Sequence, residues 1–312
     1  MSRKKLIAGG IILLAVIVAV ASITSDPTSK MGSGGEGVVG VIPVEGAIMG
    51  GTQNLFSGIA GSEDIMEQVR EAAQDPSVKA VVLRINSPGG GVAATQEISR
   101  EIEKLKKTGK PVVASMGDTA ASGGYWLSAA ADKIYANAGT ITGSIGVRMD
   151  TQNLQELYKK LGIDFDVIKS GPYKDIGSTS REITPEERNI LQGMVDEIFS
   201  EFVNVVAQGR KMPREEVEKL ATGRIFTGKQ AKDLKLVDEI GNYYDAVQGA
   251  ARMAGIKGEP IVKYFGKTSV FSSFLEGKGD LSLFIRYLLD SGSLPSQQIN
   301  APLLLAVPDS LE

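Results

Sequence analysis

The stretch Thr119-Ala120-Ala121-Ser122-Gly123-Gly124-Tyr125-Trp126 joins a predicted buried strand to a predicted helix. Most of its residues are too small to fill a core, so the backbone and the Ser122 hydroxyl stay accessible. A serine at the start of a helix lies beside unpaired N–H groups and the positive end of the helix dipole. That setting suits a nucleophile or the oxyanion of an acyl-transfer intermediate. A helix-capping serine in a tight turn explains the same residues, so the choice depends on the rest of the chain.

The composition narrows the possible chemistry, because the 312 residues include no histidine and no cysteine. A Ser-His-Asp triad, a cysteine nucleophile, imidazole or thiolate metal sites and disulfides are therefore excluded. A nucleophilic serine needs a lysine, an acid or no base at all. We expect no cofactor and no metal ion. The length allows one large or two modest domains with a real core.

The N-terminus has the pattern of a membrane anchor. Three basic residues precede the uncharged run Leu6 to Ile23, which is about the shortest that crosses the hydrocarbon core. The positive-inside rule then places the N-terminus in the cytoplasm and the rest outside the cell membrane. We expect a basic leader at 1–5, a single transmembrane anchor at 6–24 and a flexible Gly/Ser/Pro linker at 25–36. A signal peptide cleaved near Ala19-Val20-Ala21 is the alternative.

The rest of the chain alternates predicted strands with predicted helices, which indicates an α/β class with a largely parallel sheet. Apolar runs predict strands at 38–44, 78–85, 111–116, 133–138 and 165–168. Helical periodicity predicts helices at 63–73, 126–131, 153–161, about 184–209, 213–220, 229–234 and 243–253, and one that follows Gly91. In the long helix after Thr184, the apolar stripe comprises Ile190, Met194, Ile198, Phe202 and Val205. We assign 37–265 to one domain and 266–312 to a C-terminal helical or tail segment.

A second glycine-rich turn, Asn86 to Gly91, follows the strand at 78–85. It lacks the spacing of a dinucleotide fingerprint or a P-loop, so nucleotide binding has little support. Glycines also allow backbone N–H groups to approach a carbonyl oxygen closely. A simple loop that leads into the next helix is the structural alternative. The chain carries 34 basic and 37 acidic residues, and this balance gives no reason to expect nucleic acid.

Without histidine, a lysine is the natural base for Ser122. Its amine must be neutral, so its pKa has to fall from about 10.4 through burial, and a fall of three units costs about 4 kcal/mol. Lys174 follows a strand end and a Gly-Pro turn and precedes the apolar Ile176. Lys169 is the competitor, at a strand end where solvation is expected. A surface role is the usual one for any lysine.

Taken together, four motifs resemble the signal peptide peptidase A (SppA) family in its short, single-repeat bacterial form. They are Asn86-Ser87-Pro88-Gly89-Gly90, Ala121-Ser122-Gly123-Gly124-Tyr125, Thr142-Gly143-Ser144-Ile145-Gly146-Val147, and Lys169-Ser170-Gly171 with Lys174-Asp175. The likeness extends from about Val38 to Tyr244. It implies the Clp protease/crotonase-like fold, with repeated ββα units, and a Ser-Lys dyad in place of a triad.

The resemblance assigns roles to residues of this chain. Ser122 matches the nucleophile of the family and Lys174 its general base. Ser144 matches the serine that orients the lysine amine. Gly89 matches the oxyanion-hole glycine, and the N–H of Gly123 would be the second donor.

The resemblance also implies a place and a substrate. It suggests a membrane-anchored homo-oligomer, a ring or dome with its sites inside, that degrades apolar peptides such as residual signal peptides. The dyad can form within one protomer or between neighbours. A substrate strand could pair with the main chain at Gly89 to Gly91 and Gly123 to Gly124. Alternatives are a peptidase that trims membrane-associated partner proteins, a crotonase-like acyl-CoA enzyme and a non-catalytic scaffold.

The C-terminus ends in an apolar segment, Leu303 to Val307. We expect such a segment to be buried, either in the core, in a subunit contact or in a groove that binds peptides. We therefore also consider that the tail occupies the substrate groove and restrains activity.

Overall fold

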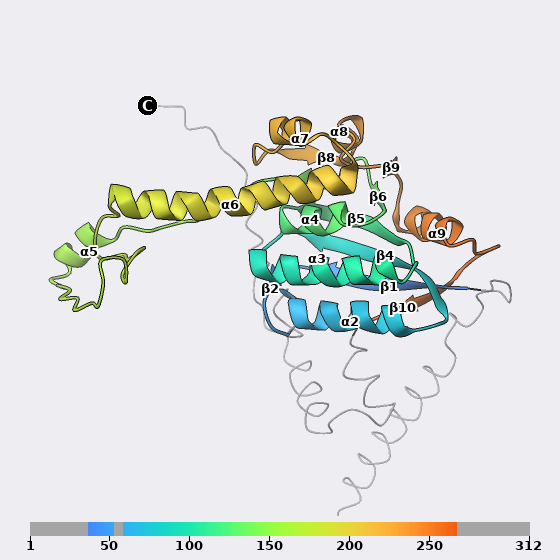
Figure 1. The fold of residues 1–312 in the computed structure, drawn as a ribbon, viewed down its shortest axis with the longest axis horizontal. Coiled ribbons are helices and arrows are strands. Elements are labelled where there is room, and N and C mark those ends of the chain that lie inside the picture. Colours follow the sequence, from blue (N-terminus) through green and yellow to red (C-terminus); the bar gives the residue numbers. More distant parts are fainter. Residues whose placement is uncertain (1–36, 53–58, 267–312) are drawn as a thin grey trace, which may run out of the picture. The chain divides into compact units, whose positions relative to one another are not determined.

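The central sheet consists of apolar strands with helices on both faces (Figure 1). The computed structural model describes residues 37–52 and 59–266. In this part of the chain the strands follow the order β10-β1-β4-β5-β6-β9, and each neighbouring pair is parallel. β7 continues the sheet in parallel beside β5, and β8 pairs with β7 in the antiparallel sense. The expected α/β class with a largely parallel sheet is confirmed.

Most elements lie where the sequence predicts them. The strands are β1 (Val38–Glu45), β2 (Ala47–Met49), β3 (Ile59–Gly61), β4 (Val78–Ser87), β5 (Val112–Ala121), β6 (Lys133–Ala136), β7 (Ile141–Gly143), β8 (Ile225–Thr227), β9 (Glu239–Ile240) and β10 (Ile261–Tyr264). The helices are α2 (Ser62–Gln74), α3 (Val92–Lys107), α4 (Gly123–Ala129), α5 (Gln155–Lys160), α6 (Pro185–Arg210), α7 (Arg214–Leu220), α8 (Gly228–Asp233) and α9 (Tyr243–Met253).

The strand predicted at residues 165–168 is wrong. These residues form no strand, and their side chains are exposed, including Ile168 at 96%. An apolar run becomes a strand only where another strand offers hydrogen bonds, and none of the described residues pairs with this run.

Alternating side chains of β4 divide the core into two layers. Val81, Leu83 and Ile85 belong to the larger cluster, beneath α2, α3 and α4. Ala80 and Val82 point to the opposite face, where α9 packs. A strand buried on both faces is nearly continuous in apolar residues, which explains why an apolar run in the sequence predicted β4.

Helix α6 begins with a complete capping box. Thr184 accepts a hydrogen bond from the Glu187 N–H, Glu187 accepts one from the Thr184 N–H, and Pro185 takes the first helical position. The helix is about 39 Å long, from a rise of about 1.5 Å for each of its 26 residues.

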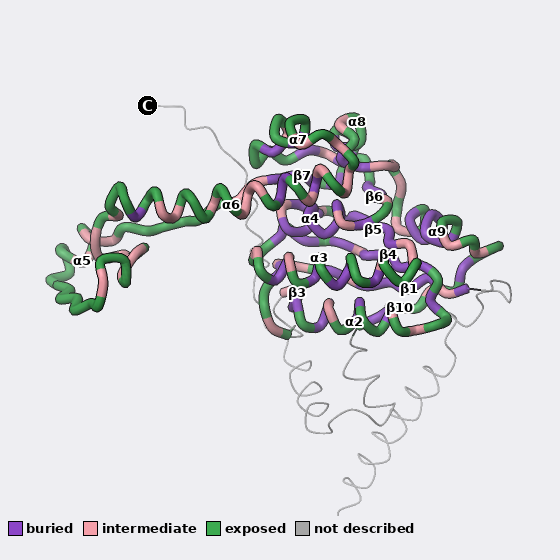
Figure 2. The backbone as a smooth tube through the Cα atoms, in the orientation of Figure 1, coloured by how far each residue is buried: buried purple, intermediate pink, exposed green. Residues whose placement is uncertain are grey.

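Only the second half of α6 packs on the core. Phe202 is 2% exposed and its ring lies 4.9 Å from that of Trp126 on α4, centroid to centroid. Met194, in the middle of the predicted apolar stripe, is 49% exposed. The stripe is therefore correct near Phe202, whereas the first half of α6 and α5 extend away from the sheet (Figures 1 and 2).

The predicted anchor at 6–24 and linker at 25–36 lie outside the described residues, and so does the tail beyond Gly266, with its segment Leu303 to Val307. Within 37–52 and 59–266, no helix combines the length and the apolar character that crossing a bilayer requires.

Replacement of Phe202 tests how α6 is held. Phe202→Ala removes a buried ring and should lower the free energy of unfolding by about 3–5 kcal/mol. Gln208→Ala, at an exposed position of the same half of the helix, is the control and should change it by less than about 0.5 kcal/mol. Denaturant unfolding of the purified protein measures both. Equal effects of the two substitutions would contradict this packing.

Candidate active site

Ser122 occupies a strained position where β5 meets α4. Its φ of 53° and ψ of −120° are rare for a residue with a side chain. The Ser122 N–H donates to the carbonyl of Gly143 at 2.9 Å, and its carbonyl accepts from Trp126 at 2.9 Å. Its side chain makes no capping hydrogen bond and is half-buried. The capping interpretation is therefore wrong, and the hydroxyl remains available for chemistry.

The glycine turn that follows β4 touches this serine directly. A Cβ placed on Gly89 would lie 2.8 Å from the Ser122 Cβ and 2.7 Å from the Gly123 nitrogen. Gly89 is buried and has a φ of +98°, so the position requires glycine for two reasons. Parallel pairing of β4 with β5 brings these two turns to the same edge of the sheet. That edge, at the carboxyl ends of parallel strands, is where α/β proteins bind ligands.

Two N–H groups beside Ser122 are free to stabilise an oxyanion. The N–H groups of Gly123 and Gly90 donate to no acceptor within the described ranges. The Gly89 N–H, in contrast, donates to the Ser87 hydroxyl at 3.1 Å. Among the described residues, the unpaired N–H group of the turn is therefore that of Gly90, whereas the sequence motif pointed to Gly89.

The Gly89 to Gly91 edge is already paired within the chain. Ile48 of β2 donates to the Gly89 carbonyl at 2.9 Å and accepts from the Gly91 N–H at 2.8 Å. The idea that a substrate strand adds to these two groups is therefore wrong for this structure. The sequence did not predict the pairing of Ile48 with this turn, because a three-residue strand that pairs with a distant segment has no local sequence pattern.

Ser144 lies next to Ser122 by register. β7 pairs with β5 so that Gly143 faces Ala121, and the following residues of both strands are the two serines. Ser144 also has a positive φ, 51°, and its N–H donates to the carbonyl of Arg224 at 2.8 Å. The β7–β8 pair therefore fixes the backbone of Ser144 beside the nucleophile candidate.

Lys174 lies on the segment between α5 and α6, which extends beyond the sheet (Figure 1). Its side chain is exposed. The burial that a lysine base needs is therefore not supplied by the described residues of the same chain. The competitor, Lys169, is engaged: its amine donates to Asp175 at 2.7 Å and to the Pro172 carbonyl at 3.1 Å.

An ion network ties this segment to the start of α6. Arg181 contacts both Asp175 and Glu187. The Arg181 guanidinium and then the Thr184 N–H lower the pKa of Glu187 to about 2. Arg181, followed by Lys169, lowers the pKa of Asp175, and both carboxylates raise the pKa of Arg181.

The helix that bears this network separates Lys174 from Ser122 within one chain. Phe202, which contacts α4, comes seventeen residues after Pro185, or about 25 Å along the helix. Lys174 is fixed near the first turn of α6, and Ser122 directly precedes α4. The four-carbon stem of a lysine side chain is much shorter than this separation. The structure therefore does not bring Lys174 and Ser122 together in a single chain.

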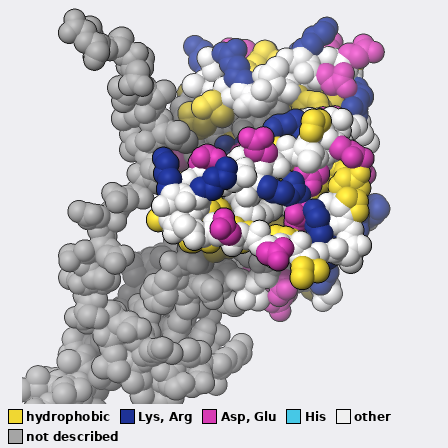
Figure 3. Space-filling view, turned by 90° about the vertical axis from the view of Figure 1, so that its left-hand side faces the viewer, with side chains coloured by type: hydrophobic (Ala, Val, Ile, Leu, Met, Phe, Trp, Pro, Cys, Tyr) yellow, Lys and Arg dark blue, Asp and Glu magenta, His cyan; other side chains and the backbone are white. Residues whose placement is uncertain are grey.

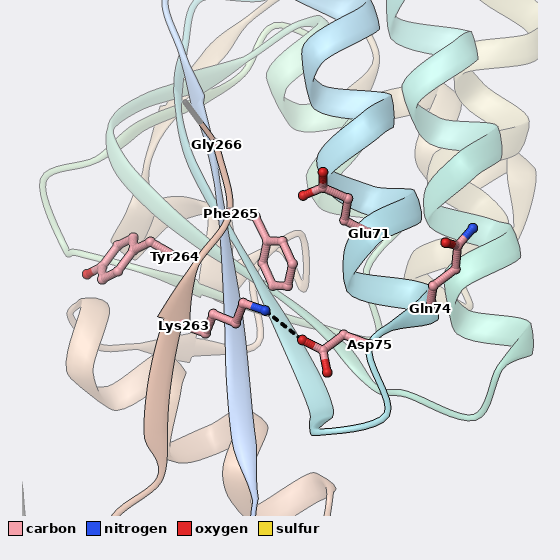
Figure 4. Close-up of a pocket in the computed structure, with 7 residues that line it drawn as sticks. All are labelled: Glu71, Gln74, Asp75, Lys263, Tyr264, Phe265 and Gly266. Atoms are coloured by element: carbon pink, nitrogen blue, oxygen red, sulfur yellow. Dashed lines mark hydrogen bonds and ion pairs between the residues drawn. The ribbon is translucent and has the colours of Figure 1, made fainter. Parts of the chain in front are cut away.

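A separate hollow of about 420 Å³ lies between α2 and β10 (Figure 4). Glu71, Asp75 and Lys263 contribute charged groups to it, and the Lys263 amine points to Asp75 at 2.7 Å. Asp75 precedes the amino end of β4, whereas Ser122 follows the carboxyl end of the parallel β5. This hollow is therefore at the opposite end of the sheet from the candidate site.

Charges of both signs alternate over the face shown in Figure 3, where basic side chains lie among acidic ones. That face offers no continuous basic surface of the kind that binds nucleic acid.

Comparisons with known proteins identify the family of the chain. Residues 104–257 match the model of peptidase family S49, a range that includes Ser122, Ser144 and Lys174. A candidate protease of Synechocystis sp. is 45% identical over 215 residues, which cover 69% of this chain and 74% of that protein. The chain belongs to peptidase family S49.

Other relatives make this S49 chain a serine peptidase of the signal peptide peptidase A type. Protease 4 of Salmonella typhi is 40% identical over 71% of the chain, and the serine protease SPPA of Arabidopsis chloroplasts is 38% identical over 62%. The chain spans only 35% and 29% of the length of these two proteins. Its substrates are peptides, and its mixed α/β architecture fits the Clp protease-like fold of the family.

Gly89→Ala tests the contact between the two turns. The added methyl group would displace Ser122, so we expect peptide cleavage to fall at least about 100-fold in kcat/KM. Gly109→Ala is the matched control, since Gly109 has a φ of +85° but open space around it. The control should lose about 1 kcal/mol of stability and keep its activity. Similar activity in both variants would refute the contact.

Acid should weaken the ion network. The folded pKa values of Asp175 and Glu187 lie below the unfolded ones, so their contribution to stability is complete above about pH 5 and is lost as the pH falls towards about 2. Glu187→Gln should therefore unfold at a lower temperature than the wild type at pH 7, and the gap should close in acid. An equal difference in unfolding temperature between the two proteins at pH 7 and near pH 2 would contradict the prediction.

Proposed function

We propose that this S49 chain is a membrane-anchored serine endopeptidase that cleaves apolar peptides, such as residual signal peptides, with a Ser122–Lys174 dyad. The observation that carries the proposal is the strained, uncapped Ser122 beside free N–H groups. A chain without histidine has few other ways to activate such a serine. The N-terminal anchor would hold the catalytic domain on the extracytoplasmic side of the cell membrane.

The reaction follows from the groups at the site. Neutral Lys174 removes the proton of the Ser122 hydroxyl while the oxygen attacks the peptide carbonyl carbon. N–H groups of Gly123 and of the Gly89–Gly90 turn bind the oxyanion. The C–N bond then breaks, the amine leaves with the proton from Lys174, and an acyl group remains on Ser122.

Water completes the cycle. Lys174, again neutral, takes a proton from a water molecule that attacks the acyl-enzyme, and the acid product leaves as Ser122 regains its proton. Ser144 is proposed to orient the amine, and its position next to Ser122 in the β5–β7 register supports this role. Its replacement should slow the enzyme less than loss of either dyad residue.

The dyad is proposed to form between neighbouring subunits. The separation of about 25 Å along α6 supports this arrangement, since α6 extends the Lys174 segment away from its own Ser122. A partner would also bury the amine, which is exposed in the single chain.

Exposed apolar side chains on the same segment support a subunit contact. Soluble proteins rarely leave so many apolar groups together in water. Those exposed around α5 and the segment after it are Leu157, Leu161, Ile163, Phe165, Val167, Ile168 and Tyr173. A ring or dome of identical chains would cover them with the next copy, as a head-to-tail interface does.

Mixing two inactive variants tests both the dyad and its arrangement. Ser122→Ala and Lys174→Ala should each abolish cleavage of a quenched apolar peptide. Co-expressed in equal amounts, the two should recover about a quarter of the wild-type activity, because random assortment in a ring completes one site in four. Each variant expressed alone is the control.

Two results would overturn the proposal. Near wild-type cleavage by either single variant would remove that residue from the dyad. Co-expressed assemblies that contain both chains but stay inactive would show that Ser122 and Lys174 must come from the same chain.

A further inference from the structure

We propose that Arg181 positions Lys174 for the reaction by fastening the segment that carries Lys174 to the first turn of α6. This inference rests on the proposed function, in which Lys174 is the base. It assigns a positioning role to a residue that does not touch the reacting atoms.

Arg181 joins two carboxylates through its planar fork. Its Nε and one terminal nitrogen donate to the two oxygens of Asp175 at 2.9 and 2.8 Å. The other terminal nitrogen donates to Glu187 at 2.8 Å. Such two-point contacts fix direction as well as distance, which a lysine at this position could not do.

One end of this connection is part of α6 itself. The Glu187 side chain is 3% exposed, and its carboxylate also accepts the Thr184 N–H at 2.9 Å in the capping box. The Thr184 hydroxyl in turn accepts the Glu187 N–H at 3.2 Å. The first turn of α6 therefore holds Glu187 in one position, and Glu187 provides a fixed attachment point for Arg181.

The other end reaches the residue next to the base. Asp175 directly follows Lys174, and Arg181 also donates to the Asp175 backbone carbonyl at 3.3 Å. Lys169 adds a contact of 2.7 Å to the same carboxylate. The backbone beside Lys174 is thus fixed from two sides.

The Lys174 side chain, in contrast, stays available. Its backbone N–H donates to the Gly171 carbonyl at 3.3 Å, but no group in the described part of the chain accepts a hydrogen bond from its amine. A fixed backbone with an unengaged, exposed amine is the arrangement needed to deliver a base into a site on another subunit.

The connection continues to the core through α6. The second half of the helix packs on α4 at Trp126, four residues after Ser122. Because a helix is stiff over this length, Arg181 links the position of Lys174 to the core rather than to a loose segment. Misplacement of a catalytic group by about 1 Å can cost about 100-fold in rate, so a small change at Arg181 should be measurable.

Substitutions at both ends of the connection test the role. We expect Arg181→Gln to lower kcat about tenfold or more with KM changed less than about twofold, because substrate contacts stay intact. Arg181→Lys keeps the positive charge but loses the planar fork, so its kcat should lie between those of the wild type and Arg181→Gln. Glu187→Gln should resemble Arg181→Gln, and the double variant should be no worse than the poorer single one, since both act through one connection.

Arg214→Gln is the matched control. Arg214, on α7, also binds α6, but in the second half of that helix, where it donates to the Ser200 hydroxyl at 3.1 Å. It also forms an ion pair of 2.8 Å with Glu218 of α7 itself. Its kcat should stay within about twofold of the wild type. All variants are compared as the full assembled protein on the same quenched apolar peptide.

The outcomes separate this inference from the dyad itself. If Lys174→Ala is inactive and Arg181→Gln has wild-type kcat, the positioning role is overturned and the dyad stands. If Lys174→Ala is active, the dyad is overturned, and the inference with it. Should Arg181→Gln fail to assemble, Arg181→Lys decides, and a wild-type kcat in that variant overturns the role.

Discussion

The close approach of two glycine turns at the carboxyl ends of β4 and β5 is the constraint on which the site depends. Gly89 can lie against Ser122 only because it has no side chain, and this contact holds the serine in a backbone conformation that it would otherwise avoid. Core packing stabilises this contact, because apolar side chains on both faces of β4 and β5 fix the register of the two parallel strands. Strain at Ser122 is therefore maintained by the core.

The molecule separates two tasks along its length. The sheet and α4 hold Ser122 and the N–H groups of Gly90 and Gly123, which are unpaired among the described residues, while α6 extends the segment with Lys174 away from them. Each part is rigid for its own reason: the sheet through burial, and the Lys174 segment through the charged contacts of Arg181. If Lys174 acts as proposed, the geometry of the site depends on α6 as much as on the strands.

The sequence predicted the fold well where one local signal decided the structure. Buried strands such as β4 and the start of α6 at Thr184 each carry a pattern within a few residues. The run at 165–168 shows the limit, because its apolar residues indicate a strand but do not say whether a partner exists. The stripe of α6 has the same limit: periodicity marks Met194 and Phe202 alike, and only the position of α4 decides which of them is buried.

Within the site, motifs located Ser122, Ser144 and the glycine turn, because each has a distinctive composition. The pairing of Ile48 with that turn and the bridge from Arg181 to Glu187 could not be predicted, since both join residues through space without a repeated spacing. The same holds for the Gly89 N–H, whose bond to Ser87 directs attention to Gly90 as well.

The separation of serine and lysine along α6 has a consequence for the cell. With the proposed dyad formed between subunits, a newly made chain would cleave no peptide until it met other copies, so activity would depend on the local concentration of the protein. Under this proposal, isolated copies would stay inactive, and peptide cleavage would be confined to assembled oligomers. Such control would follow from the length of one helix.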